Sequence, residues 1–396
     1  MNKKNVIQCI DRFGPINRSA IAKMVGLSIP AVMDITEELI AHGLVTSAMR
    51  EGSGQGKRPE VLSLSGDRFR LVGVDVGRTT TRLVLVGLDK RILRSQKFPT
   101  EPVAQPRQYA ERVAQAVEQL IEQAGIDPAT VLGVCVAKPG LIEPETGRVI
   151  FSPNFGWQDV PLKAWMSELL PYPVMVENAN RAQALWEVCV HPDDERLTVL
   201  CVGLGYGIGG ALIEQGKVYR GASGTSGEIG HVTVSKDSGA LCSCGNTGCL
   251  ESLASGAALS QQARTIVAGH VKTILRDMAG EAPEKIDAKM VFDAAALGDH
   301  AARLLIDRAA EYIGIALAMT INLLDPDKIY LCGGLMKNGP YFLTKIKDCT
   351  LRRQMHQAGR NVSIQTGSAE EWNVALGATQ VIPFYDWDGP ALAFMR

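Results

Sequence analysis

The chain carries almost no net charge and has no long uninterrupted apolar run. Its 41 lysines and arginines nearly balance 42 aspartates and glutamates, so no basic field covers the molecule and any nucleic-acid binding requires a local patch. The longest apolar stretches, 199–213 and 313–324, are rich in glycine or interrupted by Thr320 and Asn322, which argues against a membrane span. No charged segment followed by an apolar one opens the sequence. We therefore expect a cytoplasmic protein with no membrane partner.

Length and composition indicate a globular protein with more than one domain. Hydrophobic residues make up 46% and charged residues 21% of the 396 positions. A chain of this length usually divides into two or three domains, because single cores stop growing at about 250–300 residues. Six of the nine cysteines, Cys9 and Cys332 among them, are scattered and are expected to be buried as small apolar side chains.

One histidine and three cysteines lie close together in the segment GHVTVSKDSGALCSCGNTGCLE, residues 230–251. In a reduced compartment such a cluster more often holds a metal than forms disulfides. Three thiolates and one imidazole complete a tetrahedral zinc shell, and a closed shell of this kind is structural. The alternative is a set of unrelated buried thiols beside a surface histidine. We predict a structural zinc site formed by His231, Cys242, Cys244 and Cys249.

Residues 1–65 are predicted to form a winged helix-turn-helix. A first helix over about residues 18–25 ends at Gly26, and a second follows the N-cap Ser28 and ends at His42 and Gly43. This spacing is typical of a helix-turn-helix, whose second helix enters the major groove of DNA.

The segment LVTSAMREGSGQGKRPEVLSLS predicts two strands joined by a glycine-rich wing, with Lys57 and Arg58 placed to contact phosphate or the minor groove. The second helix, however, exposes Asp34, Glu37 and Glu38, which favours the alternative of a small protein-docking module. If the module binds DNA, base contacts are expected from Ser28, Ala31, Met33 and Thr36.

The rest of the chain repeats one pattern of strand, glycine turn and strand. It occurs in LVGVDVGRTTTRLVLVGLD from Leu71 and again in TVLCVGLGYGIGGALIEQGKVY from Thr198. With helical stretches at 106–124 and 301–324, this predicts a duplicated α/β core whose two lobes face a cleft. Backbone N–H groups of such turns can face phosphate, and a carboxylate there can hold hydrated Mg²⁺. The candidate phosphate-binding residues are Asp75, Gly77, Thr79, Gly205 and Gly207.

From about residue 71 to residue 382 the sequence resembles the ROK family of repressors and sugar kinases, which have the actin-like ATPase fold. The resemblance is carried by VDVGRT, AKPGLIEPETG, SPNFGWQDVPL, VENANRAQALWE, GASGTSGEIGH, CSCGNTGCLE and LLDPDKIYLCGGL. With the N-terminal module, the chain is similar to the branch of N-acetylglucosamine, glucose and xylose repressors. The domains implied are a winged helix-turn-helix (1–65), a kinase-like lobe 1 (71–180 with 381–396) and a lobe 2 with the zinc loop (181–380).

The resemblance also implies a sugar site. A zinc-bound histidine has a fixed ring, so its second N–H can point at a sugar hydroxyl, and neighbouring carboxylates accept hydrogen bonds from hydroxyls. The alternative is that Glu228 and Glu251 are only solvated charges on a loop. The implied sugar-binding residues are Asn154, Asn178, Glu228, His231 and Glu251.

The sequence departs from the kinases of this family at two positions. The kinases carry Glu-Asn-Asp where this chain has Glu177, Asn178 and Ala179, and that aspartate is the general base. A methyl group accepts no proton, and losing a positioned base typically costs ~10²–10⁴-fold in rate. In an extended segment Glu177 would point to the opposite face. Arg78 also replaces a glycine of the phosphate turn, and together the two departures argue against phosphoryl transfer and against binding of ATP and Mg²⁺.

Together these patterns favour a sugar-responsive transcriptional regulator, most simply a repressor, with a catalytically inactive kinase-like domain. Its expected partners are operator DNA, a sugar or amino-sugar effector, and a second copy of itself, as a homodimer or a dimer of dimers. The main alternative is an ATP-dependent sugar kinase with an appended DNA-binding domain.

Overall fold

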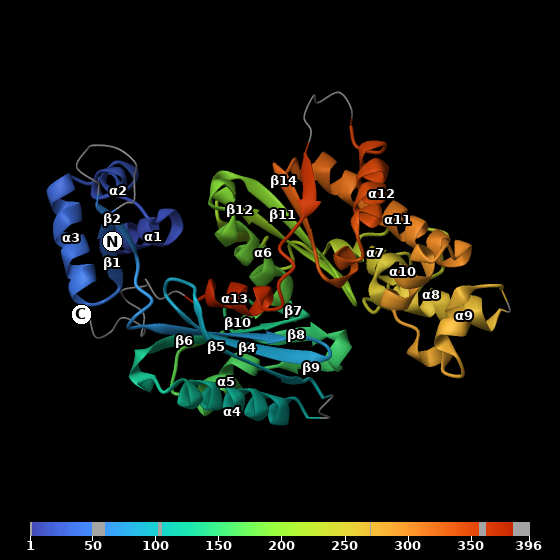
Figure 1. Cartoon of the computed structure of the whole chain (residues 1–396), viewed down its shortest axis with the longest axis horizontal. Coiled ribbons are helices and arrows are strands. Elements are labelled where there is room, and N and C mark those ends of the chain that lie inside the picture. Colours follow the sequence, from blue (N-terminus) through green and yellow to red (C-terminus); the bar gives the residue numbers. More distant parts are fainter. Residues whose placement is uncertain (1, 50–59, 102–104, 270, 356–361, 383–396) are drawn as a thin grey trace. The chain divides into compact units, whose positions relative to one another are not determined.

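The computed structural model describes residues 2–49, 60–101, 105–269, 271–355 and 362–382. The chain forms two compact units, Met1–Pro192 with Trp372–Arg396 (unit 1) and Asp193–Glu371 (unit 2) (Figure 1). The C-terminal segment of the chain therefore belongs to the same unit as the N-terminus.

Among the first 65 residues, the described ones (2–49 and 60–65) form three helices and a two-stranded antiparallel sheet, and the helical region fits a helix-turn-helix. The elements are α1 (Asn2–Phe13), α2 (Arg18–Val25), α3 (Ile29–Ala41), β1 (Val45–Met49) and β2 (Glu60–Leu64). Side-chain oxygens of Asn17 and Ser28 cap α2 and α3, and Gly26, in the left-handed region at φ 70°, ends α2. The predicted helix pair and strand pair are confirmed, whereas no prediction covers α1.

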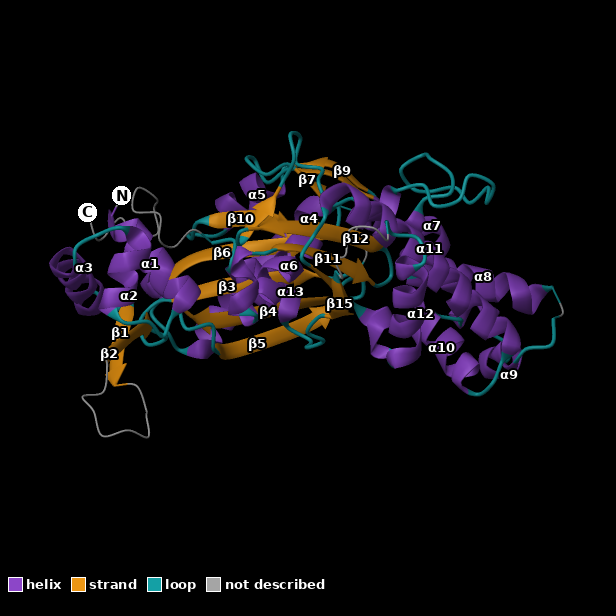
Figure 2. Ribbon diagram, turned by 90° about the horizontal axis from the view of Figure 1, so that it is seen from above, coloured by secondary structure: helices purple, strands orange, loops and turns teal. Residues whose placement is uncertain are grey.

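The remainder of unit 1 is built around a mixed sheet. Its elements are β3 (Arg70–Val76), β4 (Thr80–Gly87), β5 (Ile92–Pro99), α4 (Pro106–Ala124), η1 (Pro128–Thr130), β6 (Val131–Lys138), β7 (Leu141–Ile142), β8 (Val149–Ser152), η2 (Pro153–Phe155), β9 (Trp157–Val160), α5 (Leu162–Leu169), β10 (Val174–Asn178), α6 (Ala179–Val190) and α13 (Asn373–Thr379). The strands lie in the order β10-β6-β3-β4-β5 (Figure 2). Helices α4 and α5 cover one face of this sheet, and α6 and α13 cover the other (Figure 1).

Unit 2 contains a second five-stranded sheet and most of the remaining helices. Its elements are β11 (Thr198–Leu204), β12 (Ile208–Glu214), β13 (Lys217–Tyr219), η4 (Ile229–His231), α7 (Leu250–Ala254), α8 (Gly256–Ala268), α9 (Ile274–Ala279), η5 (Pro283–Lys285), α10 (Ala288–Ala296), α11 (His300–Leu324), β14 (Lys328–Cys332), η6 (Gly334–Lys337), α12 (Pro340–Leu351) and β15 (Ser363–Thr366). The apolar side of α11 packs in the core of this unit.

The two sheets share one topology. In each, a central strand pairs antiparallel with the next strand in sequence and parallel with a later one; the order in unit 2 is β13-β12-β11-β14-β15. The central strands β3 and β11 are the first strands of the two repeated segments. The predicted duplication is therefore confirmed, as is the mixed α/β class.

No single described helix is long and apolar enough to span a membrane. Helices α2 and α3 are long and apolar enough only when they are counted together, and the chain bends by 113° between them.

The N-terminal module packs against the sheet of unit 1. One apolar cluster contains Ile7 and Ile10 of α1, Leu62 of β2, and Val84 and Val86 of β4, all buried. Because these side chains form one cluster, α1 packs on the sheet of unit 1 through apolar contacts.

An ion pair lies beside the same junction. Lys90, in the turn between β4 and β5, has its ammonium 3.1 Å from a carboxylate oxygen of Asp11 in α1. Burial lowers the pKa of Lys90, but Asp11 and the Cys189 thiol outweigh this effect, so the pKa lies above its usual value. The stabilisation is therefore fully present below about pH 10.5 and is lost as the pH rises through the folded-state pKa.

Asp11→Asn keeps the shape of the side chain and removes its charge. Because the largely buried Lys90 ammonium then lacks its carboxylate, we expect the free energy of unfolding at pH 7 to fall by about 1–3 kcal/mol, measured by denaturant titration. The matched control is Asp159→Asn at the exposed Arg148 pair, which should change it by less than ~0.5 kcal/mol. Equal stability of Asp11→Asn and wild type would mean that apolar packing alone holds the module.

Candidate functional site

The predicted metal ligands of unit 2 meet in one cluster. The ligand atoms of His231, Cys242, Cys244 and Cys249 all lie within 4.8 Å of one another. The Cys242 sulfur is 3.4 Å from Nδ1 of His231, and the Cys244 sulfur is 3.7 Å from the Cys249 sulfur. In tetrahedral zinc with Zn–S of about 2.3 Å and Zn–N of about 2.0–2.1 Å, such separations are about 3.5 and about 3.8 Å. The four residues therefore fit a tetrahedral metal ion.

Glycines and backbone hydrogen bonds bring the ligands of this loop together. Gly245 and Gly248 have φ values of 92° and 73°, and a Cβ on Gly248 would lie 1.8 Å from the carbonyl oxygen of Ser235. Cys242 N donates to Asn246 O at 2.8 Å, which closes the turn that contains the second and third ligands, Cys242 and Cys244. The loop conformation therefore requires glycine at position 248.

The thiols of the cluster are free and differ in acidity. No disulfide links Cys242, Cys244 and Cys249. Burial, with the neighbouring thiols, raises the pKa of Cys249 to about 12, whereas a backbone hydrogen bond from Asn246 lowers that of Cys244. A divalent cation would reverse the effect at Cys249, because the metal binds the thiolate form.

The same loop positions three predicted sugar-binding side chains in unit 2. Because Nδ1 of His231 faces the thiols, its Nε2 is directed elsewhere and lies 4.0 Å from an Oε atom of Glu228. Glu251, in the first turn of α7, accepts the backbone N–H of Ile208 at 2.8 Å. A Cβ on Gly207 would lie 2.4 Å from the Glu251 carboxylate, so the glycine turn after β11 and the predicted sugar carboxylate are in direct contact.

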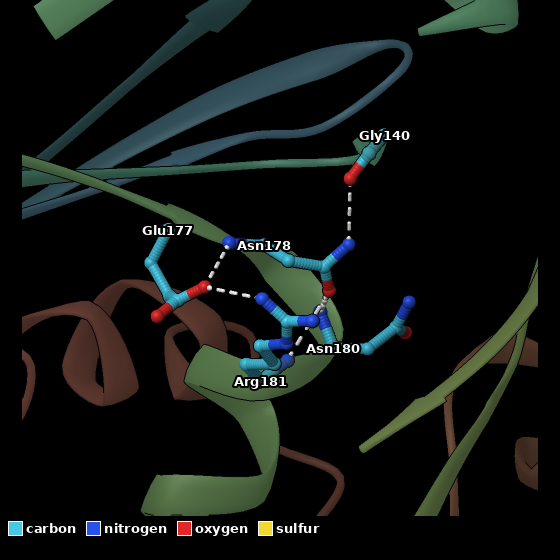
Figure 3. A network of polar contacts seen from close by, with 5 residues as sticks. All are labelled: Gly140, Glu177, Asn178, Asn180 and Arg181. Carbon is cyan, nitrogen blue, oxygen red and sulfur yellow. Dashed lines mark hydrogen bonds and ion pairs between the residues drawn. The ribbon is translucent and has the colours of Figure 1, made fainter. Parts of the chain in front are cut away.

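Asn178 holds the end of strand β10 to its surroundings in unit 1 (Figure 3). Its side-chain oxygen accepts the N–H groups of Asn180 at 2.8 Å and Arg181 at 3.3 Å, which caps α6. Its side-chain nitrogen donates to the carbonyl oxygen of Gly140 at 2.8 Å. Among the hydrogen bonds of the described residues, one N–H of the Asn178 side chain is not used. Asn178 can therefore donate a hydrogen bond to a ligand.

Glu177 is engaged inside unit 1. It is 2% exposed, and one carboxylate oxygen accepts from the backbone N–H of Asn178 at 2.8 Å and from the guanidinium of Arg181 at 3.5 Å (Figure 3). Ala179 is the first residue of α6. Glu177 is therefore both buried and ion-paired with Arg181.

The predicted phosphate turn of unit 1 contains an ion pair. Asp75, at 8% exposure, lies 3.4 Å from the guanidinium of Arg82, and burial raises the pKa of Asp75 to about 6 against the effect of that charge. Gly77 approaches the Thr80 carbonyl so closely that a Cβ would lie 2.6 Å from its oxygen. The turn also exposes Thr79.

Arg78 of this turn donates to the side-chain oxygen of Asn154 at 3.4 Å. Asn154 is exposed on η2, so the side chain that departs from the kinase pattern reaches a predicted sugar-binding residue. In unit 2, Gly205 donates its N–H to the carbonyl oxygen of Gly207 at 3.0 Å and forms the corresponding turn.

The predicted DNA-contacting residues of α3 differ in exposure. Ser28 is exposed while its hydroxyl caps the helix, Ala31 is half-buried, and Met33 is 48% exposed. Thr36 is fully buried: its hydroxyl accepts from Arg18 at 2.9 Å and donates to the carbonyl oxygen of Met33 at 3.0 Å. Lys57 and Arg58 lie outside the described residues.

Two arginines of these networks are missing from the sequence predictions. Arg181 follows Glu177 by four residues, a spacing at which oppositely charged residues form an ion pair on one helix. Here, however, Glu177 lies on strand β10 and Arg181 on helix α6. Arg82 reaches Asp75 across the β3–β4 pair, where the two residues are directly opposed in register. Such cross-strand pairs could have been proposed from the predicted hairpin.

Comparison with known proteins places these features in a family. The family model described as the ROK family matches residues 71–383. The xylose repressor of Caldicellulosiruptor bescii is 28% identical over 383 residues, 96% of this chain and 95% of that protein. The N-acetylglucosamine repressor of Escherichia coli O157:H7 is 28% identical over 96% of this chain and 92% of that protein. A glucokinase of Halalkalibacterium halodurans is 34% identical, over 70% of this chain and 83% of the kinase.

Solved structures of ROK family proteins are also similar to this chain. A ROK family transcriptional regulator described as a homologue of the E. coli MLC protein superposes with a TM-score of 0.82 at 26% identity, covering 100% of this chain and 97% of that one. A ROK glucokinase from Streptomyces griseus, in complex with glucose and AMPPNP, has a TM-score of 0.68 at 29% identity and covers 79% of this chain. The chain belongs to the ROK family.

Proposed function

We propose that this protein is a sugar-responsive transcriptional repressor that binds operator DNA through its N-terminal module and a sugar through its kinase-like part. The observation that carries the proposal is coverage: the named repressors match 96% of the chain, whereas the glucokinase matches 70%. The helix-turn-helix of the first 65 residues supports a DNA-binding role for the part that the kinase match omits.

DNA recognition is assigned to the N-terminal half of α3 and to the wing. Ser28, Ala31 and Met33 are available to meet base edges, whereas the burial of Thr36 takes that side chain out of direct readout. Phosphate contacts are proposed for Lys57 and Arg58. A homodimer, or a dimer of dimers, would match a palindromic operator and double these contacts.

The effector is proposed to be a sugar or amino sugar. Asn154 and Asn178 of unit 1 and Glu228, His231 and Glu251 of unit 2 are the residues assigned to it, by resemblance to the family. Carboxylates accept hydrogen bonds from sugar hydroxyls, and the remaining N–H of Asn178 can donate to a sugar oxygen.

The metal of the cysteine cluster is proposed to be zinc. Three thiolates and an imidazole at these separations suit zinc, whose closed shell would supply structural order rather than chemistry. Holding Nδ1 of His231 fixes the ring and presents Nε2 on the side of Glu228.

We infer that the kinase-like part is not catalytic. Ala179 stands where a kinase needs its general base, and Glu177 is occupied by Arg181. Arg82 already neutralises Asp75, the carboxylate that would hold hydrated Mg²⁺. The second candidate, an ATP-dependent sugar kinase with an appended DNA-binding domain, is favoured by the 34% identity to a glucokinase.

The proposed function is tested in two steps. A thermal-shift screen with D-xylose, D-glucose, N-acetylglucosamine and the 6-phosphates of the two hexoses should identify a ligand that raises Tm, because binding to the folded state stabilises it. Fluorescence anisotropy with the chain's own promoter DNA should then give salt-dependent binding that this ligand changes. Absence of DNA binding at any salt concentration would contradict the repressor and favour the docking module.

Metal content tests the cysteine cluster. Protein purified without chelators should contain about one zinc per chain, and chelation should lower Tm and weaken sugar binding together, because the metal orients His231. Cys244→Ser should reproduce both losses, whereas Cys201→Ser, at a buried cysteine of β11 outside the cluster, should retain the metal. Zinc-free protein with full sugar affinity would contradict this assignment.

Ala179→Asp tests the missing base. The wild type should bind its sugar without sugar-dependent ATP turnover, whereas Ala179→Asp should gain slow phosphorylation if ATP binds, since a positioned base is worth ~10²–10⁴-fold. An aspartate in the first turn of α6 also suits the helix dipole, so the fold should tolerate it. Asn180→Asp is the control, with the carboxylate one residue further along. Robust phosphorylation by the wild type would establish the kinase instead.

A further inference from the structure

Lys138, the last residue of β6, is fully buried in unit 1. Its ammonium nitrogen lies 3.2 Å from the ring centroid of Phe155 and 4.1 Å from that of Trp157. These two rings contact each other edge to face, and both contact Tyr109 of α4 in the same way. The amino group therefore lies in an aromatic cage inside the protein.

Packing alone does not account for an amino group at this position. Among the described residues no carboxylate forms an ion pair with Lys138, and burial lowers its pKa well below the usual value. Desolvating an amine is costly, whereas methionine has a similar length and packs well against aromatic rings. A side chain that served only to fill this volume would therefore not need a nitrogen.

The Lys138 nitrogen is bonded to the segment that carries Asn154. It donates to the hydroxyl of Ser152 at 3.0 Å, and that hydroxyl donates to the carbonyl oxygen of Pro139 at 2.7 Å. Ser152 precedes Asn154 by two residues, and Phe155 follows it directly. Lys138 thus contacts both sides of Asn154, through a hydrogen bond on one side and an aromatic ring on the other.

The backbone of Lys138 is equally close to the other sugar-binding segment of unit 1. In the parallel β6–β10 pair, Lys138 stands opposite Asn178 in register. The turn after Lys138 also receives the side chain of Asn178, through the carbonyl oxygen of Gly140 (Figure 3). Gly140, at φ 128°, approaches Ser152 so closely that a Cβ would lie 2.8 Å from that of Ser152.

We propose that Lys138 is a positioning residue for sugar binding: its amino group holds the Asn154 segment at a fixed distance from the Asn178 segment. The inference rests on the proposed sugar site, because those two asparagines are assigned to the sugar there. Lys138 itself is enclosed and does not touch the ligand; it acts through Ser152 and Phe155.

The test uses Lys138→Met in the full-length chain, with three measurements. The Tm should stay within a few degrees of wild type, because the substitution replaces a costly buried amine with an apolar side chain of similar length. Amide hydrogen exchange of residues 150–158 and 176–182 should nevertheless become at least tenfold faster. The affinity for whichever of D-xylose, D-glucose and N-acetylglucosamine binds the wild type should fall at least tenfold.

Three further variants keep the test decisive. Ser152→Ala removes the same hydrogen bond from the other side and should reproduce the faster exchange, even if Lys138→Met does not fold. Lys138→Arg keeps nitrogen donors near Ser152 and should retain part of the affinity. Lys163→Met, at a half-buried lysine of α5 whose amino group donates to the Glu145 carbonyl at 3.4 Å, should change neither exchange nor affinity.

Hydrogen exchange needs no sugar, so its result separates this proposal from the proposed function. Faster exchange without binding of any of the three sugars would support Lys138 as the residue that orders both segments and would count against the effector assignment. Unchanged exchange in both Lys138→Met and Ser152→Ala, or a lower Tm with wild-type exchange and sugar affinity, would overturn the proposal and leave Lys138 as a packing residue.

Discussion

The side chain of Asn178 connects the fold of unit 1 to its proposed ligand. At the junction of strand β10 and helix α6, its amide oxygen accepts the first free N–H groups of the helix. Its amide nitrogen donates to the carbonyl oxygen of Gly140 in the neighbouring turn. Because these bonds use both lone pairs and one N–H, little freedom remains in the orientation of the side chain. A ligand that accepts the last N–H would meet a donor already fixed by the fold, which lowers the entropic cost of binding.

Unit 2 follows the same principle with different chemistry. Among its proposed sugar-binding side chains, His231 contacts the cysteine cluster, and Glu251 accepts the backbone N–H of Ile208. In both units the residues assigned to the sugar are fixed by a turn at the end of a strand or the start of a helix. Alanine at position 179 leaves these supports intact, so the proposed absence of catalysis is compatible with the proposed sugar binding.

Much of this arrangement could be predicted from the sequence, because local patterns specify it. The helix pair of the N-terminal module follows from the caps at Ser28 and Gly26, and the metal cluster follows from the spacing of its cysteines. Helix α1 and the burial of Thr36 could not be predicted from such local patterns. Each depends on contacts between segments that only the tertiary structure brings together, such as the bond from Arg18 to Thr36.

If sugar and DNA bind the same molecule in a coupled way, thermodynamic linkage requires each ligand to change the affinity for the other. Calorimetry should measure the sugar affinity of the full-length protein with and without saturating operator DNA, and anisotropy should measure the operator affinity with and without saturating sugar. We expect both affinities to change by the same factor, about 5–150-fold for a typical coupling free energy of ~1–3 kcal/mol. A sugar affinity that is identical with and without operator DNA would contradict this expectation.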